Sequence, residues 1–149
     1  MKYSKVRKVK SIERGTKKSA GIDFFIPEDF REQVLLPTQS VLIPSGIKIN
    51  IPKNHVLIML NKSSIAAKKR LLIGAQVIDE DYQGEIHIDL HNVGARNITL
   101  KPGMKITQGI LLPVNYASPE EVPIENLYTK KTKRGSGGFG STNNIKKEK

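Results

Sequence analysis

Glu85-Ile86-His87-Ile88-Asp89-Leu90-His91 is the stretch that best reveals the fold, because apolar and polar residues alternate along its whole length. Successive side chains of a β-strand point to opposite faces, so a period of two predicts a strand. Ile86, Ile88 and Leu90 share one face, and we expect that face to be buried in the core.

Short runs rich in Val, Ile and Leu recur on both sides of this strand, between Pro, Gly and Asn residues. These runs are 41–43, 47–51, 56–60 and 106–114. One short helix is expected at 65–70, where Ser63 and Ser64 would cap the first turn and the cations would lie at the C-terminal end. Many short strands with frequent turns predict an all-β sandwich, barrel or jelly roll.

The chain has 149 residues and no cysteine, which suits one domain. The absence of cysteine excludes a disulfide framework, a thiolate zinc site and a thiol nucleophile, and it is compatible with a reducing compartment. The longest uncharged stretch, 33–47, contains two prolines and is shorter than the roughly 18 apolar residues that a spanning helix needs. We therefore expect no membrane span, no secretory signal and a cytoplasmic location.

The net charge of +11 is concentrated at the two ends of the chain. Residues 1–18 hold eight cations and one acid, and residues 129–149 hold seven cations and one acid. The body between them holds ten cations and twelve acids, so it is nearly neutral. This predicts two basic arms, which either are simply solvated or attract polyphosphate or nucleic acid, and not the basic face of a dedicated DNA-binding domain.

The apolar pattern stops after Tyr128, and four glycines fall between Gly135 and Gly140. We therefore divide the chain into a β domain, residues 1–128, and a mobile C-terminal arm, residues 129–149. Glycines, hydroxyls and one arginine between 134 and 142 are the ingredients of a phosphate-binding loop, although a flexible Gly/Ser tail has the same composition. Phe139 favours the binding loop, because an aromatic ring in such a tail needs something to stack on.

Two further segments can support chemistry. In the expected hairpin at 74–85, Asp79 follows two apolar residues, so its carboxylate could be partly dry and act as a base; a solvated acidic turn is the alternative. Asn61-Lys62-Ser63-Ser64 could bind an anion at the helix start, although helix capping explains both serines equally well. His87 and His91 share a strand face with Asp89, but no further metal ligand is patterned, so solvated side chains are expected there.

Taken together and in order, five segments resemble the motifs of the trimeric deoxyuridine triphosphatase (dUTPase) family. They are Ala20–Phe24, Asn61–Ser64, Val77–Gly84, Gly103–Gln108 and Arg134–Thr142. The resemblance implies a distorted jelly-roll-like β-barrel that forms a homotrimer, with active sites at the subunit interfaces. It also implies hydrolysis of dUTP to dUMP and pyrophosphate with Mg²⁺, and it requires no nucleic acid.

The resemblance further implies a role for each motif residue. Asp79 would activate the water that attacks the α-phosphorus, Tyr82 would stack on the deoxyribose and exclude a 2′-hydroxyl, and Asp23 would reach the metal through water. Uracil would be contacted by Gln76, Val77, Ile78 and His87. The phosphates would be contacted by Lys62, Ser63, Ser64, Lys105 and Gln108. The C-terminal motif would contribute Arg134, Ser141 and Thr142 at the γ-phosphate, with Gly140 beside them and Phe139 over the uracil ring.

The sequence departs from the family pattern at a few positions. Lys62 and Lys105 stand where arginine is usual, and Gln76 stands where glycine is usual. Two alternatives share many of these features: a dCTP deaminase of the same fold, and a nucleotide-sensing or nucleic-acid-binding module without turnover. The Tyr82 hairpin, Asp79 and the Phe139 arm favour the hydrolase.

Overall fold

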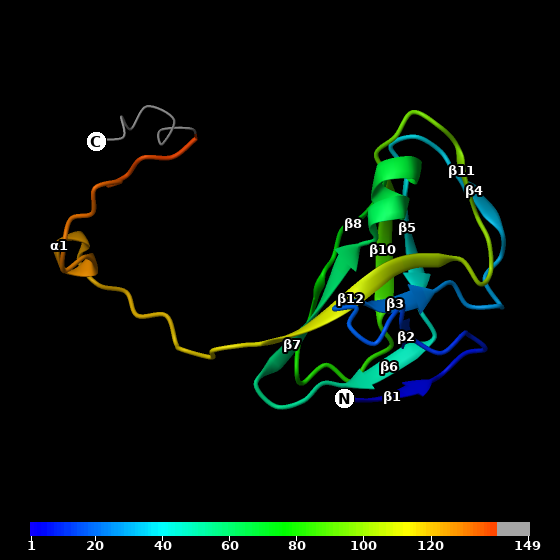
Figure 1. Ribbon diagram of the computed structural model, residues 1–149, viewed down its shortest axis with the longest axis horizontal. Coiled ribbons are helices and arrows are strands. Elements are labelled where there is room, and N and C mark those ends of the chain that lie inside the picture. Colours follow the sequence, from blue (N-terminus) through cyan, green and yellow to red (C-terminus); the bar gives the residue numbers. More distant parts are fainter. Residues whose placement is uncertain (140–149) are drawn as a thin grey trace. The chain divides into compact units, whose positions relative to one another are not determined.

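The computed structural model describes residues 1–139, which divide into two compact units. The first unit is Met1–Tyr116, and it contains every strand of the described chain; the second begins at Ala117 and contains the helix α1 (Ile124–Leu127) (Figure 1). The β unit therefore ends earlier than the boundary at residue 128 that the sequence suggested. No helix among the described residues is long and apolar enough to cross a membrane.

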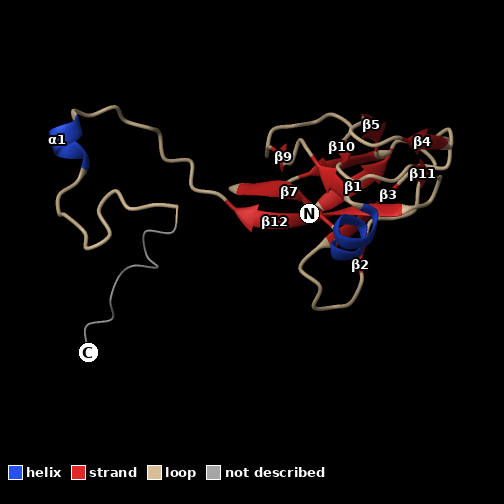
Figure 2. Cartoon of the chain, turned by 90° about the horizontal axis from the view of Figure 1, so that it is seen from above, coloured by secondary structure: helices blue, strands red, loops and turns tan. Residues whose placement is uncertain are grey.

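The largest sheet has five antiparallel strands in the order β2-β3-β12-β7-β9. Their bounds are β2 (Glu13–Arg14), β3 (Ile22–Phe25), β12 (Lys105–Pro113), β7 (His55–Asn61) and β9 (Val77–Ile78). The long strand β12 lies between β3 and β7, as the two views show (Figure 2). Four of the five motif segments lie on this sheet or directly beside its strands.

The remaining strands form three smaller sheets. The order β5-β10-β8 joins β5 (Ser40–Pro44), β10 (His87–Asn92) and β8 (Leu71–Ile73). The two-stranded sheets pair β1 (Lys2–Lys5) with β6 (Ile47–Asn50), and β4 (Gln33–Leu35) with β11 (Ile98–Leu100). This mostly β architecture is the jelly-roll-like fold that the sequence predicted.

The alternating stretch at 85–91 lies where its pattern placed it. Ile86, Ile88 and Leu90 are each no more than 1% exposed, so the predicted core face is confirmed. Phe24 on β3 and Leu57 on β7 are fully buried in the same core cluster. Burial of this continuous apolar cluster is the main favourable term that holds the sheets together.

The predicted short helix is present as η1, a turn of π-helix at Ile65–Lys69. The predicted serine cap is wrong for Ser64, because its backbone is already helical (φ −67°, ψ −33°) and its side chain makes no capping hydrogen bond. Lys68 and Lys69 lie in the last turn as expected, and Arg70 ends the helix in a left-handed conformation. The helix α1 was not predicted.

The N-terminal basic segment is mostly exposed to solvent, as its charge suggested, but it is not a free arm. Its strands β1 and β2 pair with β6 and β3, and Val9 is only 4% exposed. A strand can carry lysines without losing its backbone pairing, because side chains outside the sheet stay in water. The charge of this segment therefore does not predict its position, which is decided by the strands that pair with it.

Candidate active site

A buried carboxylate with two lysines lies at the centre of the five-stranded sheet. Asp23, on β3, is 3% exposed, and its Oδ1 and Oδ2 lie 2.8 Å from Lys62 Nζ and 2.7 Å from Lys105 Nζ. Burial raises the pKa of Asp23, but the hydrogen bonds from Lys105 and Lys62 outweigh this and hold the pKa below its usual value. The hydrogen bond to Asp23 raises the pKa of Lys105. Lys105 is therefore held as a cation beside a carboxylate that stays ionised.

Gln108 lies next to this cluster and is held from two sides. It pairs with Asp23 across β3 and β12, and its Nε2 donates to the Asn61 carbonyl oxygen at 3.0 Å. A methyl group on Gly21 would overlap the Gln108 side-chain carbonyl, so only glycine leaves room for this arrangement. Asn61 also orders the next strand, because its Oδ1 accepts from the Ile73 amide at 2.8 Å. The sequence indicated the motif that contains Asn61, but not this hydrogen bond to the next strand.

Ser63 and Ser64 follow Lys62 directly and are both exposed. Because Ser64 does not cap the helix, its hydroxyl is free to bind a ligand. Of the two explanations for Ser64, helix capping is therefore eliminated. The strands β3, β7 and β12 bring Lys62, Lys105 and Gln108 together around Asp23, and the two serines directly follow Lys62 in the chain.

A second group of motif residues belongs to the segment from β9 to β10. Ile78 pairs with Leu57 on β7, and Asp79 follows Ile78 in the chain. Asp79 is exposed in the single chain. It is therefore not the partly buried carboxylate that the sequence suggested. The Tyr82 amide donates to the Asp79 carbonyl oxygen at 3.2 Å and closes the turn. Gln76 is not among the described residues with positive φ, so its backbone does not require the glycine that is usual there.

Tyr82 is folded back over its own turn. Its hydroxyl donates to the Glu85 carbonyl oxygen at 2.8 Å. A methyl group on Gly84 would overlap the hydroxyl and the ring of Tyr82, so the glycine makes room for the phenol. Gly84 belongs to the predicted motif, but this steric function is not evident from the sequence.

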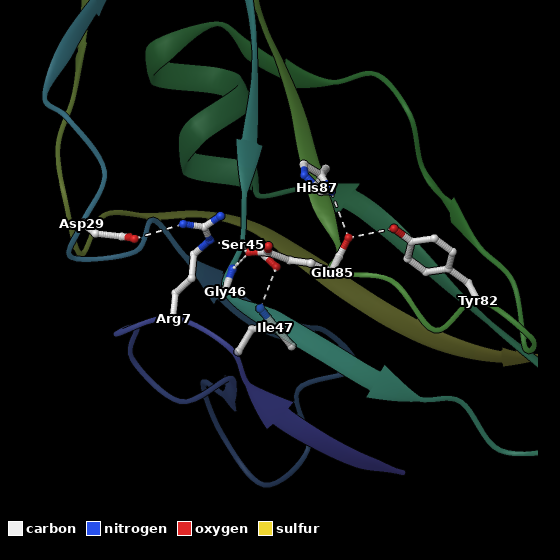
Figure 3. A network of polar contacts seen from close by, with 8 residues as sticks. All are labelled: Arg7, Asp29, Ser45, Gly46, Ile47, Tyr82, Glu85 and His87. Atoms are coloured by element: carbon white, nitrogen blue, oxygen red, sulfur yellow. Dashed lines mark hydrogen bonds and ion pairs between the residues drawn. The ribbon is translucent and has the colours of Figure 1, made fainter.

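His87 contacts the same carbonyl oxygen from β10, with its Nδ1 2.9 Å from Glu85 O (Figure 3). A carbonyl oxygen can only accept, so Nδ1 carries the proton. In the neutral ring Nε2 is then an acceptor. The Glu85 carbonyl oxygen thus orders two predicted site residues, Tyr82 and His87. Glu85 itself was not among the residues predicted for the site.

The two groups lie far apart within one chain. Asp79 follows the residue that pairs with Leu57, near the start of β7, whereas Lys62 follows the end of β7. The six residue-to-residue steps from Val56 to Lys62 span about 20 Å at ~3.3 Å per step along a strand. The single chain therefore does not bring the Asp79 hairpin to the Asp23 cluster.

The C-terminal motif lies in the second unit. Arg134 Nε donates to the Gly137 carbonyl oxygen at 2.9 Å in a local turn, Gly135 has φ +53°, and Phe139 is fully exposed. The predicted residues Gly140, Ser141 and Thr142 lie outside the described residues.

Within residues 1–139, no three His, Asp or Glu side chains are grouped to hold a metal ion by themselves. Mg²⁺ does not need such a group, because it usually keeps several waters and is held by one or two carboxylates together with substrate phosphates. Each Asp23 oxygen accepts from one lysine and has a second acceptor position left. Asp23 therefore fits contact with a hydrated Mg²⁺.

Comparison with known proteins places this geometry in a family. A family model described as dUTPase matches residues 7–143. Deoxyuridine 5'-triphosphate nucleotidohydrolase of Mus musculus is 35% identical over 129 residues, which cover 87% of this chain and 75% of that protein. The protein of the same name from Clostridium kluyveri is 38% identical over 125 residues, covering 83% and 82% of the two chains.

Solved structures of dUTPases have a fold similar to that of this chain. A native dUTPase of EIAV has a TM-score of 0.69 and 30% identity, covering 84% of this chain and 98% of that one. A mutant dUTPase of Staphylococcus bacteriophage 80alpha, in a structure with dUpNHpp, has a TM-score of 0.81 over 95% of this chain and 96% of that one; at 22% identity it supports the fold alone. The chain belongs to the dUTPase family, and it is a dUTP diphosphatase.

Proposed function

We propose that this dUTP diphosphatase uses Asp79 as a general base. Asp79 would take a proton from a water whose oxygen bonds to the α-phosphorus, and the bond from that phosphorus to the α–β bridging oxygen would break. dUMP and pyrophosphate are then the products. Such a transfer depends on positioning and charge neutralisation more than on covalent chemistry, so no nucleophilic side chain is needed.

One observation indicates how the complete site is assembled: the two groups of site residues are separated along β7. A base cannot act on a triphosphate held about 20 Å away in the same chain, on the strand spacing given above. We therefore propose that a complete site combines the Asp79 hairpin of one subunit with the Asp23 cluster of another, in a homotrimer.

The hairpin would recognise the nucleoside. Backbone groups at Gln76, Val77 and Ile78, together with His87, would pair with the polar edge of uracil, and a site built to pair specific polar groups rejects a base that lacks them. Tyr82 would pack on the deoxyribose. Its phenol is half-exposed, and its hydroxyl is held by the Glu85 carbonyl oxygen. A ring fixed in this way would leave no space for a 2′-hydroxyl.

The Asp23 cluster would hold the triphosphate. Lys62, Lys105, Ser63, Ser64 and Gln108 would supply cations and donors for phosphate oxygens, and Asp23 would contact Mg²⁺ through its waters. When bound with the substrate, Mg²⁺ supplies neutralisation of the phosphate charge. A lysine gives a point charge without the two-pronged geometry of arginine, so more than one contact is needed to orient the phosphates.

The C-terminal motif would close the site. Arg134, Ser141 and Thr142 would bind the γ-phosphate, with Gly140 allowing close approach of the backbone, and Phe139 would cover the uracil ring. The full exposure of Phe139 in the single chain leaves its ring available for such a contact. Exclusion of bulk water by this arm would strengthen the electrostatic interactions inside. The proposal requires no nucleic acid, and it keeps the predicted cytoplasmic location.

The decisive experiment measures both pyrophosphate and ammonia with dUTP, UTP and each of the other deoxynucleoside triphosphates, with and without Mg²⁺. We expect pyrophosphate from dUTP alone, and faster turnover with Mg²⁺. Ammonia from dCTP would identify a deaminase, and binding without either product would identify a nucleotide-sensing module.

A further inference from the structure

We propose that Arg7 and Glu85 act as positioning residues for Tyr82, and thereby set how strictly the enzyme rejects UTP. This inference rests on the proposed role of Tyr82 as the residue that excludes the 2′-hydroxyl. It assigns a function to the N-terminal basic segment, which the motifs do not include.

The first step is the shared carbonyl oxygen. Tyr82 Oη and His87 Nδ1 lie 2.8 Å and 2.9 Å from Glu85 O and contact it from two elements, the turn and β10 (Figure 3). Any movement of this peptide group moves the acceptor of both hydrogen bonds. The two predicted nucleoside contacts are therefore tied to one point of the backbone.

The second step is the Glu85 side chain, which anchors that point. Its Oε1 accepts from the Gly46 amide at 2.7 Å and from Arg7 Nε at 2.9 Å. The side chain is only 16% exposed, so water competes little for these contacts. Hydrogen bonds to a charged group in such surroundings are among the stronger ones.

The third step is the connection from Arg7 to two distant loops. Its Nε contacts Glu85, and its Nη1 lies 3.0 Å from Asp29 Oδ2. The hydrogen bonds to Glu85 and then Asp29 raise the pKa of Arg7, so its positive charge persists. The planar guanidinium fixes both partners in one geometry, which a lysine cannot reproduce.

The fourth step is the seating of Arg7 itself. The Val6 amide donates to the Gly46 carbonyl oxygen at 2.8 Å, and Val9 is buried. Gly46 has φ +74°, and a methyl group there would press on the Arg7 and Val9 side chains. The N-terminal segment is therefore packed on Gly46, and Arg7 is presented to Glu85 from a fixed backbone.

The test compares Arg7→Ala with Lys8→Ala. Lys8 is the neighbouring cation, and its exposed ion pair with Glu28 (2.7 Å) does not involve the hairpin. We expect Arg7→Ala to lower the ratio of kcat/KM for dUTP to that for UTP by about 5- to 10-fold, as expected for loss of a hydrogen bond that holds a side chain. Lys8→Ala should leave the ratio unchanged.

Conservative variants separate positioning from folding. Glu85→Gln keeps an accepting oxygen for Gly46 and Arg7 and should preserve most of the discrimination, whereas Glu85→Ala should lose it. Arg7→Lys should give an intermediate ratio. Thermal unfolding of each variant establishes that the assay is run on folded protein, and a ratio equal to that of the wild type in folded Arg7→Ala and Glu85→Ala would overturn the proposal.

Variants at Tyr82 distinguish a failure of this inference from a failure of the proposed function. Tyr82→Phe removes the hydroxyl that contacts Glu85, so adding Arg7→Ala to it should change the ratio little, whereas independent effects would multiply. If Tyr82→Ala itself leaves the dUTP:UTP ratio unchanged, the proposed role of Tyr82 fails. If Tyr82→Ala changes the ratio and Arg7→Ala does not, only the present inference fails.

Discussion

The phenol of Tyr82 occupies the space that a side chain at Gly84 would need. The tyrosine hydroxyl can reach the Glu85 carbonyl oxygen only because residue 84 has no Cβ. The spacing of tyrosine and glycine in this motif is therefore a steric relationship, and it leads to the first prediction.

Gly84→Ala should displace Tyr82 and lower kcat/KM for dUTP by roughly 10- to 100-fold, because small misplacements of groups that contact substrate have effects of that size. Steady-state kinetics measures this directly. Gly15→Ala is the control, since a methyl group there meets only Ser19 at an ordinary 3.6 Å. Equal kinetics in the two variants would show that the position of Tyr82 does not matter.

Asp79→Asn keeps the size of the side chain but removes its ability to accept a proton. We expect kcat to fall by about 10²- to 10⁴-fold, while binding of a non-hydrolysable dUTP analogue is retained. Pre-steady-state turnover and calorimetry measure the two quantities. Glu32→Gln, which alters an exposed pair with Lys101, should change neither; near-normal kcat for Asp79→Asn would exclude Asp79 as the base.

If the protein forms the proposed homotrimer, mixed trimers test whether sites are shared between subunits. Asp79→Asn and Lys62→Met should each be inactive alone. Refolding them together should restore up to about one quarter of wild-type activity, because some interfaces then combine an intact hairpin with an intact Asp23 cluster. No recovery in verified mixed trimers would mean that both groups act from the same chain.

The pKa of Asp23 is lowered in the folded state, so the unfolded chain binds more protons at acidic pH. This carboxylate contributes stability above the ordinary aspartate pKa of about 3.9, and the contribution is lost as the pH falls through the lower folded value. Asp23→Asn should therefore reduce stability at neutral pH by about 2 kcal/mol and weaken the acid dependence. Urea unfolding between pH 2 and 7 measures both effects. Glu28→Gln, in an exposed pair, should cost little.

Phe139→Trp would add the chain's only tryptophan. If the C-terminal motif closes over substrate, a non-hydrolysable dUTP analogue with Mg²⁺ should shift its emission, and dUMP should do so less because it lacks the γ-phosphate. Tyr128→Trp places a fluorophore in the same unit outside the motif, and its emission should stay constant. Identical responses from the two variants would argue against a lid.

Local patterns in the sequence were sufficient for much of the fold. The alternation at 85–91 correctly predicted a buried face, because a strand's period of two is a property of the chain itself. The order of the five motifs correctly indicated the family, because chemistry needs particular side chains at particular spacings. The place of η1 was also predictable from residues close together in the sequence.

Tertiary structure decided what depends on partners distant in the chain. The charge of residues 1–18 suggested a solvated arm, but β1 and β2 are paired with strands that the segment itself does not reveal. The two lysines on Asp23 and the contact between Arg7 and Glu85 join residues 39 or more positions apart. Such contacts form only once the sheets have assembled, because hydrogen bonds and ion pairs depend on positions in space, whereas periodicity depends only on order along the chain.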